Sequence, residues 1–112
     1  MSVSYEGIGC LTVTFPKIQA EVGHVCRLNL LGRVETCANG DKFFGVVQAV
    51  DDATAAVQVE GFVEVHFTGT TPARGYTKLS SDGNGGVKVD SAGMEYLVVR
   101  LNSEKSTIII KL

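Results

Sequence analysis

Apolar and polar residues alternate along residues 57–68, which read V-Q-V-E-G-F-V-E-V-H-F-T. In an extended strand, alternate side chains project to opposite faces. The pattern therefore predicts a single long strand with one buried face and one solvent-exposed face, as is typical of antiparallel sheets. The residues expected on the buried face are Val57, Val59, Val63, Val65 and Phe67.

Phe62 is the exception in this strand, because it is a large apolar residue on the face that is otherwise polar. It directly follows Gly61. One interpretation is that Gly61 forms a β-bulge that shifts the register and turns Phe62 inward. The other is that Phe62 contacts another chain, which makes it a candidate interface residue.

Short alternating runs of the same kind fill the rest of the chain, with turn-forming Gly, Pro, Asn and Asp between them. No long segment has helical periodicity, and no clear internal repeat is seen. Turn signals every eight to twelve residues are typical of sandwiches and barrels. We therefore expect an all-β fold, a compact antiparallel β-barrel or sandwich of about eight or nine short strands with little or no helix. The other expected strands are residues 11–15, 26–30, 33–36, 43–50, 76–80, 87–89, 97–101 and 107–112.

Three of these segments carry specific expectations. In the second strand, Cys26, Leu28 and Leu30 share one parity and are expected to face the core. Residues 43–50 are almost continuously apolar, which predicts a strand covered on both faces. Residues 82–86, D-G-N-G-G, form a hairpin tip rather than a calcium loop, because the further carboxylates of a calcium loop are missing.

Composition narrows the possible partners. The formal net charge is -2 and there is no Trp, so a nucleic-acid partner is not expected. No basic head with an apolar stretch opens the chain, and no apolar run approaches the roughly 20 residues that span a bilayer. The sequence predicts no membrane partner, and three reduced cysteines in a cytoplasm: Cys10, Cys26 and Cys37.

Candidate chemistry is sparse. His24, Cys26, Cys37 and His66 are zinc-binding residue types, but they lack the close pairs of structural zinc sites. The expected roles are a buried Cys26 and solvated or interfacial histidines. A Cys–His nucleophile would need an orienting third group in a cleft, and no motif marks one. We therefore expect no enzyme activity, no catalytic residues, no metal and no cofactor.

Several segments together resemble a known family, the capsid decoration or head cement proteins of tailed bacteriophages. They are G-H-V-C-R-L at 23–28, G-D-K-F-F-G-V-V at 40–47, V-Q-V-E-G-F-V-E-V at 57–65, G-Y-T-K-L at 75–79, D-G-N-G-G-V-K at 82–88 and Y-L-V-V at 96–99. The resemblance implies a β-barrel-like decoration domain over residues 20–112. It also implies a homotrimer that binds the major capsid protein on the outer surface of the virion, after synthesis in the host bacterial cytoplasm.

Residues 1–19 have no counterpart in that pattern, and we expect them to be an N-terminal arm with the first strand. Leu11, Val13 and Phe15 on this strand are candidate interface residues, because the strand could add to a sheet of a neighbouring chain. The expected function is a structural protein that clamps coat subunits. The alternative is a small ligand-binding barrel or sandwich, for example for carbohydrate, against which the missing Trp weighs. A small Cys or His enzyme ranks last.

Overall fold

The computed structural model describes residues 10–112, which contain ten strands and no helix. The expectation of an all-β fold is confirmed. The strands of the first half are β1 (Leu11–Pro16), β2 (Val25–Leu28), β3 (Val34–Thr36), β4 (Gly45–Val50) and β5 (Thr54–Glu60). Those of the second half are β6 (Phe62–His66), β7 (Gly75–Ser81), β8 (Val87–Val89), β9 (Met94–Asn102) and β10 (Thr107–Lys111).

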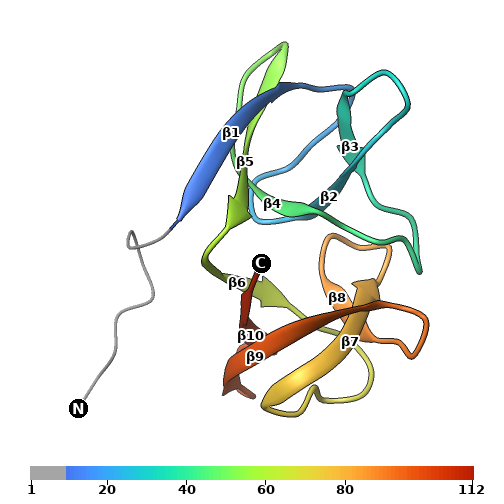
Figure 1. The fold of residues 1–112 in the computed structure, drawn as a ribbon, viewed down its shortest axis with the longest axis vertical. Coiled ribbons are helices and arrows are strands. Elements are labelled where there is room, and N and C mark those ends of the chain that lie inside the picture. The colour runs from blue at the N-terminus through green and yellow to red at the C-terminus, as the bar shows by residue number, and fades with distance from the viewer. Residues whose placement is uncertain (1–9) are drawn as a thin grey trace.

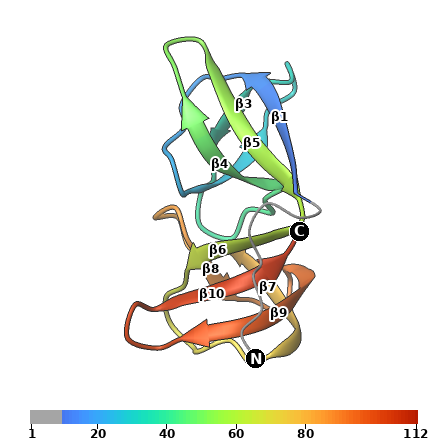
Figure 2. The same ribbon diagram turned by 90° about the vertical axis from the view of Figure 1, so that its left-hand side faces the viewer.

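The ten strands form two five-stranded antiparallel sheets with the same topology. The first sheet has the order β1-β5-β4-β2-β3, and the second has the order β6-β10-β9-β7-β8, which is the first with five added to each number. Each sheet folds into one lobe, and the two lobes stack along the long axis of the molecule (Figures 1 and 2). We call residues 10–60 the first lobe and residues 62–112 the second lobe.

Equivalent details recur in the two lobes. Just after β1, Lys17 forms a parallel bridge with Val34 of β3, and just after β6, Phe67 forms a parallel bridge with Val87 of β8. The structure therefore contains a repeat of topology that the sequence, in which no clear repeat is seen, did not predict. The repeat consists of the same pairing between strands. Different apolar side chains allow this pairing equally well, so the two lobes need not be similar in sequence.

Gly61 is the junction between the lobes. Its φ of 96° is a conformation that residues with a Cβ rarely adopt. β5 ends before Gly61 and β6 begins after it in the other sheet, so the single long strand expected over 57–67 is wrong. The bulge interpretation is wrong too, because Val63 and Val65 stay on the buried face without a change of parity. Because two strands, β5 and β6, stand where one was expected, the structure has ten strands instead of eight or nine.

Two apolar clusters form the core. The smaller one lies within the first lobe and consists of Cys26, Val34, Val47, Ala55 and Val57. The larger one fills the second lobe and extends onto the facing side of the first, where Val25, Cys37, Phe43 and Val46 join it. Across this boundary the rings of Phe43 and Tyr96 stack with centroids 4.8 Å apart, and the Tyr96 hydroxyl donates to the Phe43 carbonyl at 2.9 Å. The lobes are thus joined by a shared core.

The structure corrects two expectations about side-chain burial. Cys26 is buried, but β2 ends at Leu28, and both Leu28 and Leu30 are exposed rather than in the core. β4 is buried only in its first half, because its second half leads into an exposed hairpin with β5 at the end of the first lobe that lies away from the second lobe (Figure 2). The hairpin expected at residues 82–86 is confirmed between β7 and β8.

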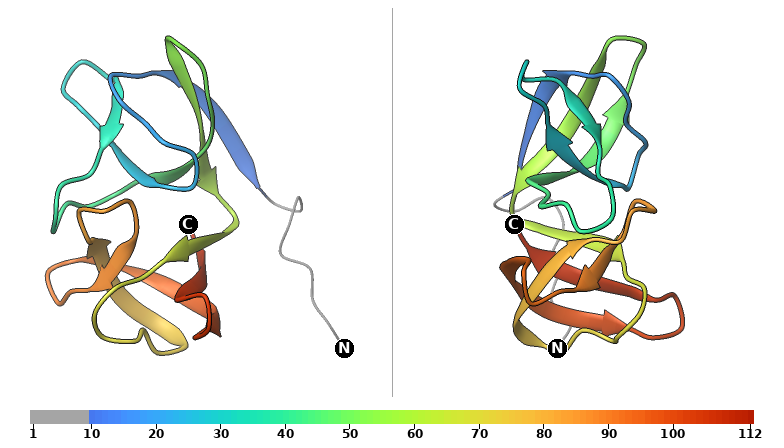
Figure 3. Two further views of the ribbon diagram at one scale, coloured as in Figure 1. Left: turned by 180° about the vertical axis from the view of Figure 1, so that it is seen from behind. Right: turned by 90° about the vertical axis from the view of Figure 1, so that its right-hand side faces the viewer.

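The first strand belongs to the first lobe. β1 pairs along its length with β5 of the same chain, from Leu11 opposite Glu60 to Pro16 opposite Thr54. It forms the outer margin of that lobe, as Figure 3 shows from behind. Residues 1–9 of the expected N-terminal arm lie outside the described residues.

Candidate interaction surface

β1 is an edge strand without charge. The first sheet ends at β1, whose sequence L-T-V-T-F-P contains no charged residue in six positions. An edge strand presents backbone N–H and C=O groups that can pair with a further strand, and proteins usually protect such edges with charges or by keeping them short. In β1 only the terminal Pro16 offers such protection.

The other three edges of the two sheets are better protected. β3 and β8 have three residues each, and the parallel bridges at Val34 and Val87 cover part of each strand. β6 carries Glu64 and the exposed His66 on its outer face. Within the part of the chain that the structure describes, β1 is therefore the edge best suited to accept a strand from a partner.

The candidate residues on β1 differ in their exposure. Leu11 is half exposed, with 50% of its surface accessible, whereas Val13 and Phe15 are only partly accessible. The Phe15 ring packs edge-on against Phe44, with centroids 5.4 Å apart at 86°, on the rim of the first-lobe core. Phe15 thus contributes to the fold of its own lobe, and Leu11 is the side chain most available to a partner.

Phe62 lies near the start of β1, although the sequence separates them by some fifty residues. It is partly buried at the lobe junction and lines a hollow of about 380 Å³ that Cys10 and Val22 also line. The structure therefore brings Phe62 to the same end of β1 as Leu11, because Leu11 pairs with Glu60, two residues before Phe62.

Gln58 holds this junction together. Its side-chain amide nitrogen lies 2.9 Å from the Phe62 carbonyl, 3.2 Å from the Glu60 carbonyl and 3.4 Å from the Cys10 sulfur, and these three acceptors share its two N–H groups. Gln58 is buried, although strand alternation predicted that it lies on the solvent-exposed face. Alternation alone gave no signal for this role, because the neighbours that cover Gln58 are set by the bend of the chain at Gly61.

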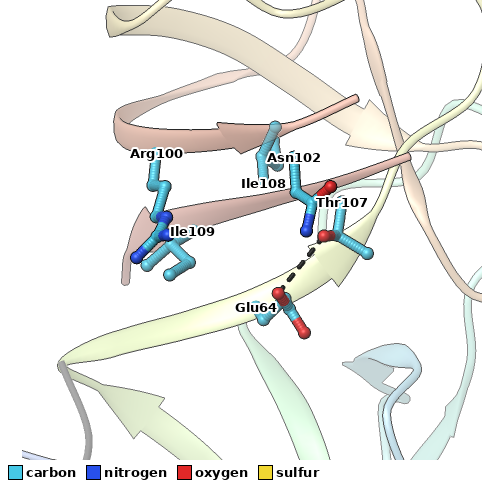
Figure 4. A pocket seen from close by; sticks show the side chains of 6 residues that line it. All are labelled: Glu64, Arg100, Asn102, Thr107, Ile108 and Ile109. Carbon is cyan, nitrogen blue, oxygen red and sulfur yellow. Dashed lines mark hydrogen bonds between the residues drawn. The ribbon is translucent and has the colours of Figure 1, made fainter. Parts of the chain in front are cut away.

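The outer face of the second sheet carries a shallow polar hollow of about 140 Å³ (Figure 4). Glu64 and Arg100 flank Ile109 on neighbouring strands, and the Thr107 hydroxyl donates to the Glu64 carboxylate at 3.2 Å. The remaining lining residues are Asn102 and Ile108. None of these residues is aromatic, so the hollow lacks the stacking platform that a sugar ring favours.

The residue types considered for zinc are not gathered by the fold. Among residues 10–112, no three His, Cys, Asp or Glu side chains lie close enough together to hold a metal ion. His24 lies 3.4 Å from the Glu21 carboxylate, while His66 is exposed on β6. None of the described segments forms a helix with the length and apolar character needed to cross a membrane.

The two buried thiols are held in their protonated form. Burial raises the pKa of Cys26 to about 12, with a smaller contribution from Cys37. Burial and the nearby Asp41 carboxylate raise the pKa of Cys37 to about 11. The thiolate is the nucleophilic form, so both residues are unreactive at neutral pH and act as core side chains.

In comparisons with known proteins, no family model, no curated protein and no solved structure matches the chain. Function is therefore inferred from the fold, its surface and the sequence pattern.

Proposed function

We propose that this protein is a structural decoration protein of a tailed-bacteriophage capsid, which binds the outer surface of the shell and stabilises the contacts between coat subunits. The observation that carries the proposal is the open, uncharged edge of β1, with Leu11 and Phe62 beside its first residues. The pattern of apolar and glycine residues that resembles the head cement family supports it independently.

In this proposal, an extended segment of the coat protein adds to β1 as a further strand. Backbone hydrogen bonds give the affinity of such strand addition, and pockets for alternate side chains give its specificity. Leu11 and Phe62 then cover apolar surface of the coat segment. Each contact is modest, but a homotrimer engages several coat subunits at once, so the overall affinity rises without a large single interface.

The test compares two single lysine substitutions for their effect on capsid binding. Thr14→Lys places a charge on the edge strand, where Thr14 is exposed, and should weaken binding to undecorated capsids by about tenfold or more, because a charged edge disfavours strand addition. Thr70→Lys, in an exposed loop of the second lobe, is the matched control and should bind like the parent. Binding is measured by co-sedimentation with capsids at fixed ionic strength.

Both possible failures are informative. If the parent does not bind undecorated capsids of its own phage, the decoration role is wrong. If the parent binds and Thr14→Lys binds equally well, the role stands and β1 is not the contact.

A further inference from the structure

Two asparagines of this chain directly precede a glycine, and their local structures are closely similar. Asn39–Gly40 lies in the loop after β3, and Asn84–Gly85 lies at the tip of the β7–β8 hairpin. Both asparagines are exposed, and the two glycines have positive φ values of 87° and 90°. Asn–Gly peptides are prone to deamidation, because glycine has no Cβ that hinders the attack of its backbone nitrogen on the asparagine side chain.

The two sites differ in the backbone N–H group of the glycine. The Gly40 N–H donates to the Ser81 carbonyl at 2.8 Å, so its nitrogen is held away from the Asn39 side chain. Among residues 10–112, the Gly85 N–H donates no hydrogen bond, and the carbonyl and side chain of Asn84 have no hydrogen-bond partner. The peptide unit between Asn84 and Gly85 is therefore free to bring the attacking nitrogen to the side-chain amide.

A neighbouring peptide of related chemistry is held in place. An Asp–Gly peptide forms the same ring from its carboxyl group, and Asp82–Gly83 is such a peptide. The Asp82 carboxylate accepts from the N–H groups of Asn84 at 2.7 Å and Gly86 at 3.1 Å. The Gly83 N–H donates to the Ser81 hydroxyl at 3.0 Å. Both reacting groups of this peptide are thus occupied.

The remaining asparagines are poor candidates. Asn29 and Asn102 precede Leu30 and Ser103, whose side chains hinder the approach of the backbone nitrogen. The side-chain oxygen of each asparagine also accepts from backbone N–H groups of its own turn. Asn84 is therefore the asparagine of the described chain that is best placed to react.

The Asn84–Gly85 peptide lies in a tip that packs on the first lobe, toward which the β7–β8 hairpin points (Figure 1). We call residues 82–86 the docked tip. The Gly85 carbonyl accepts from the Val25 N–H at 3.0 Å. A Cβ atom at Gly85 would overlap the His24 ring, and one at Gly86 would lie 2.6 Å from the His66 carbonyl. The docked tip has no room for an added atom on this side.

We propose that Asn84 is a site of spontaneous deamidation, and that the isoaspartate formed there loosens the contact between the two lobes. Hydroxide removes the proton of the Gly85 amide nitrogen, which attacks the Asn84 Cγ. The new N–C bond closes a five-membered succinimide ring, and the side-chain nitrogen leaves as ammonia. Water then opens the ring, so that one water is consumed and one ammonia is released overall.

The position of ring opening decides the product. Opening at Cγ gives aspartate with the ordinary backbone. Opening at the backbone carbonyl of residue 84 gives isoaspartate, in which the chain runs through Cβ and is one carbon atom longer. Because Gly85 is held between the Val25 N–H and the His24 ring, the longer backbone displaces it from the first lobe.

The first experiment follows deamidation of the folded parent in mildly alkaline buffer. Aspartate and isoaspartate at residues 39 and 84 are quantified by mass spectrometry of separated peptides. Residue 84 should react faster by about tenfold or more, because Asn39 reacts only after the hydrogen bond from Gly40 to Ser81 opens. In urea this hydrogen bond is absent, and the two sites should react at similar rates.

Two results of this experiment would overturn the proposal. One is a folded protein in which residue 84 reacts no faster than residue 39. The other is a folded protein in which residue 84 remains asparagine while the urea-unfolded chain deamidates at both sites.

The second experiment tests the effect on the contact between the lobes. The parent, Asn84→Gln and the control Asn39→Gln are compared before and after incubation, since glutamine closes its larger ring far more slowly. The incubated parent and control should melt several degrees lower and lose exchange protection at the Val25 N–H by about tenfold. Asn84→Gln should keep both properties.

Fresh Asn84→Asp separates the new charge from the longer backbone. It carries the charge on an ordinary backbone and should melt near the parent. Loosening by isoaspartate is wrong if incubated Asn84→Gln loses as much stability as the parent, if parent that contains isoaspartate melts like fresh protein, or if fresh Asn84→Asp melts as low as the incubated parent. Neither experiment involves a capsid, so both outcomes are independent of the proposed decoration role.

Discussion

At the scale of single residues, neighbouring positions on β6 have opposite environments. Val63 faces the large core shared by the lobes, whereas Glu64 is exposed and its carboxylate accepts from Thr107. Val63→Asp should lower the free energy of unfolding by several kcal/mol, since it buries a carboxylate among apolar side chains. Glu64→Gln keeps an oxygen that can accept from Thr107 and should change stability by under about 0.5 kcal/mol.

Urea unfolding of the two variants measures this difference. The assignment of faces on β6 would be wrong if Val63→Asp unfolded at the same urea concentration as the parent.

At the scale of elements, the β2–β3 and β7–β8 hairpins provide a matched pair of substitutions, because each has a glycine with positive φ, Gly32 and Gly85. Gly85→Ala and Gly32→Ala place a Cβ at positions with positive φ, so both suffer backbone strain on the order of 1 kcal/mol. Only Gly85→Ala also drives a methyl group into the His24 ring. It should therefore destabilise the protein clearly more than Gly32→Ala and loosen the contact between the lobes.

Thermal melts of the two variants, with hydrogen exchange at Val25, check this expectation. The Val25 N–H donates to the Gly85 carbonyl and should lose protection only in Gly85→Ala. Equal destabilisation by the two substitutions would show that the docked tip contributes nothing beyond its own turn.

At the scale of the whole molecule, two buried thiols and a buried phenol make stability sensitive to alkaline pH. Burial raises the pKa of Cys26 and Tyr96 to about 12 and that of Cys37 to about 11, from ordinary values of 9.0 for the thiols and 10.0 for the phenol. These groups release their protons at lower pH in the unfolded chain than in the folded one. Their contribution to stability is complete below pH 9 and is lost progressively between about pH 9 and pH 12.

The free energy of unfolding should accordingly fall by several kcal/mol between pH 8 and pH 11. Cys37→Ala is the control, since it removes one of the titrating groups and should make the fall shallower even though its stability at pH 8 is lower. A stability that stays flat over this range would contradict the burial of the thiols.

The sequence by itself determined the local structure of this protein. Alternating β-branched and aromatic residues, interrupted by Gly, Asn and Asp, predicted strands and turns close to those observed, including the hairpin at residues 82–86. Backbone geometry explains this success, because side-chain period and turn preference are properties of a few adjacent residues. The candidate residues Leu11, Val13 and Phe15 were likewise placed correctly on one strand.

Tertiary structure alone decided what covers each face. Alternation separates the two faces of a strand, but it does not show what packs on each face. The sequence therefore predicted a solvent-exposed Gln58 and a buried Leu30, whereas Gln58 is buried and Leu30 is exposed. The repeat of two lobes, the passage from one sheet to the other at Gly61 and the docking of one hairpin against His24 depend on contacts between residues far apart in the chain. Such contacts are fixed only when the whole chain has folded, because the burial of a face is a property of the surfaces that meet.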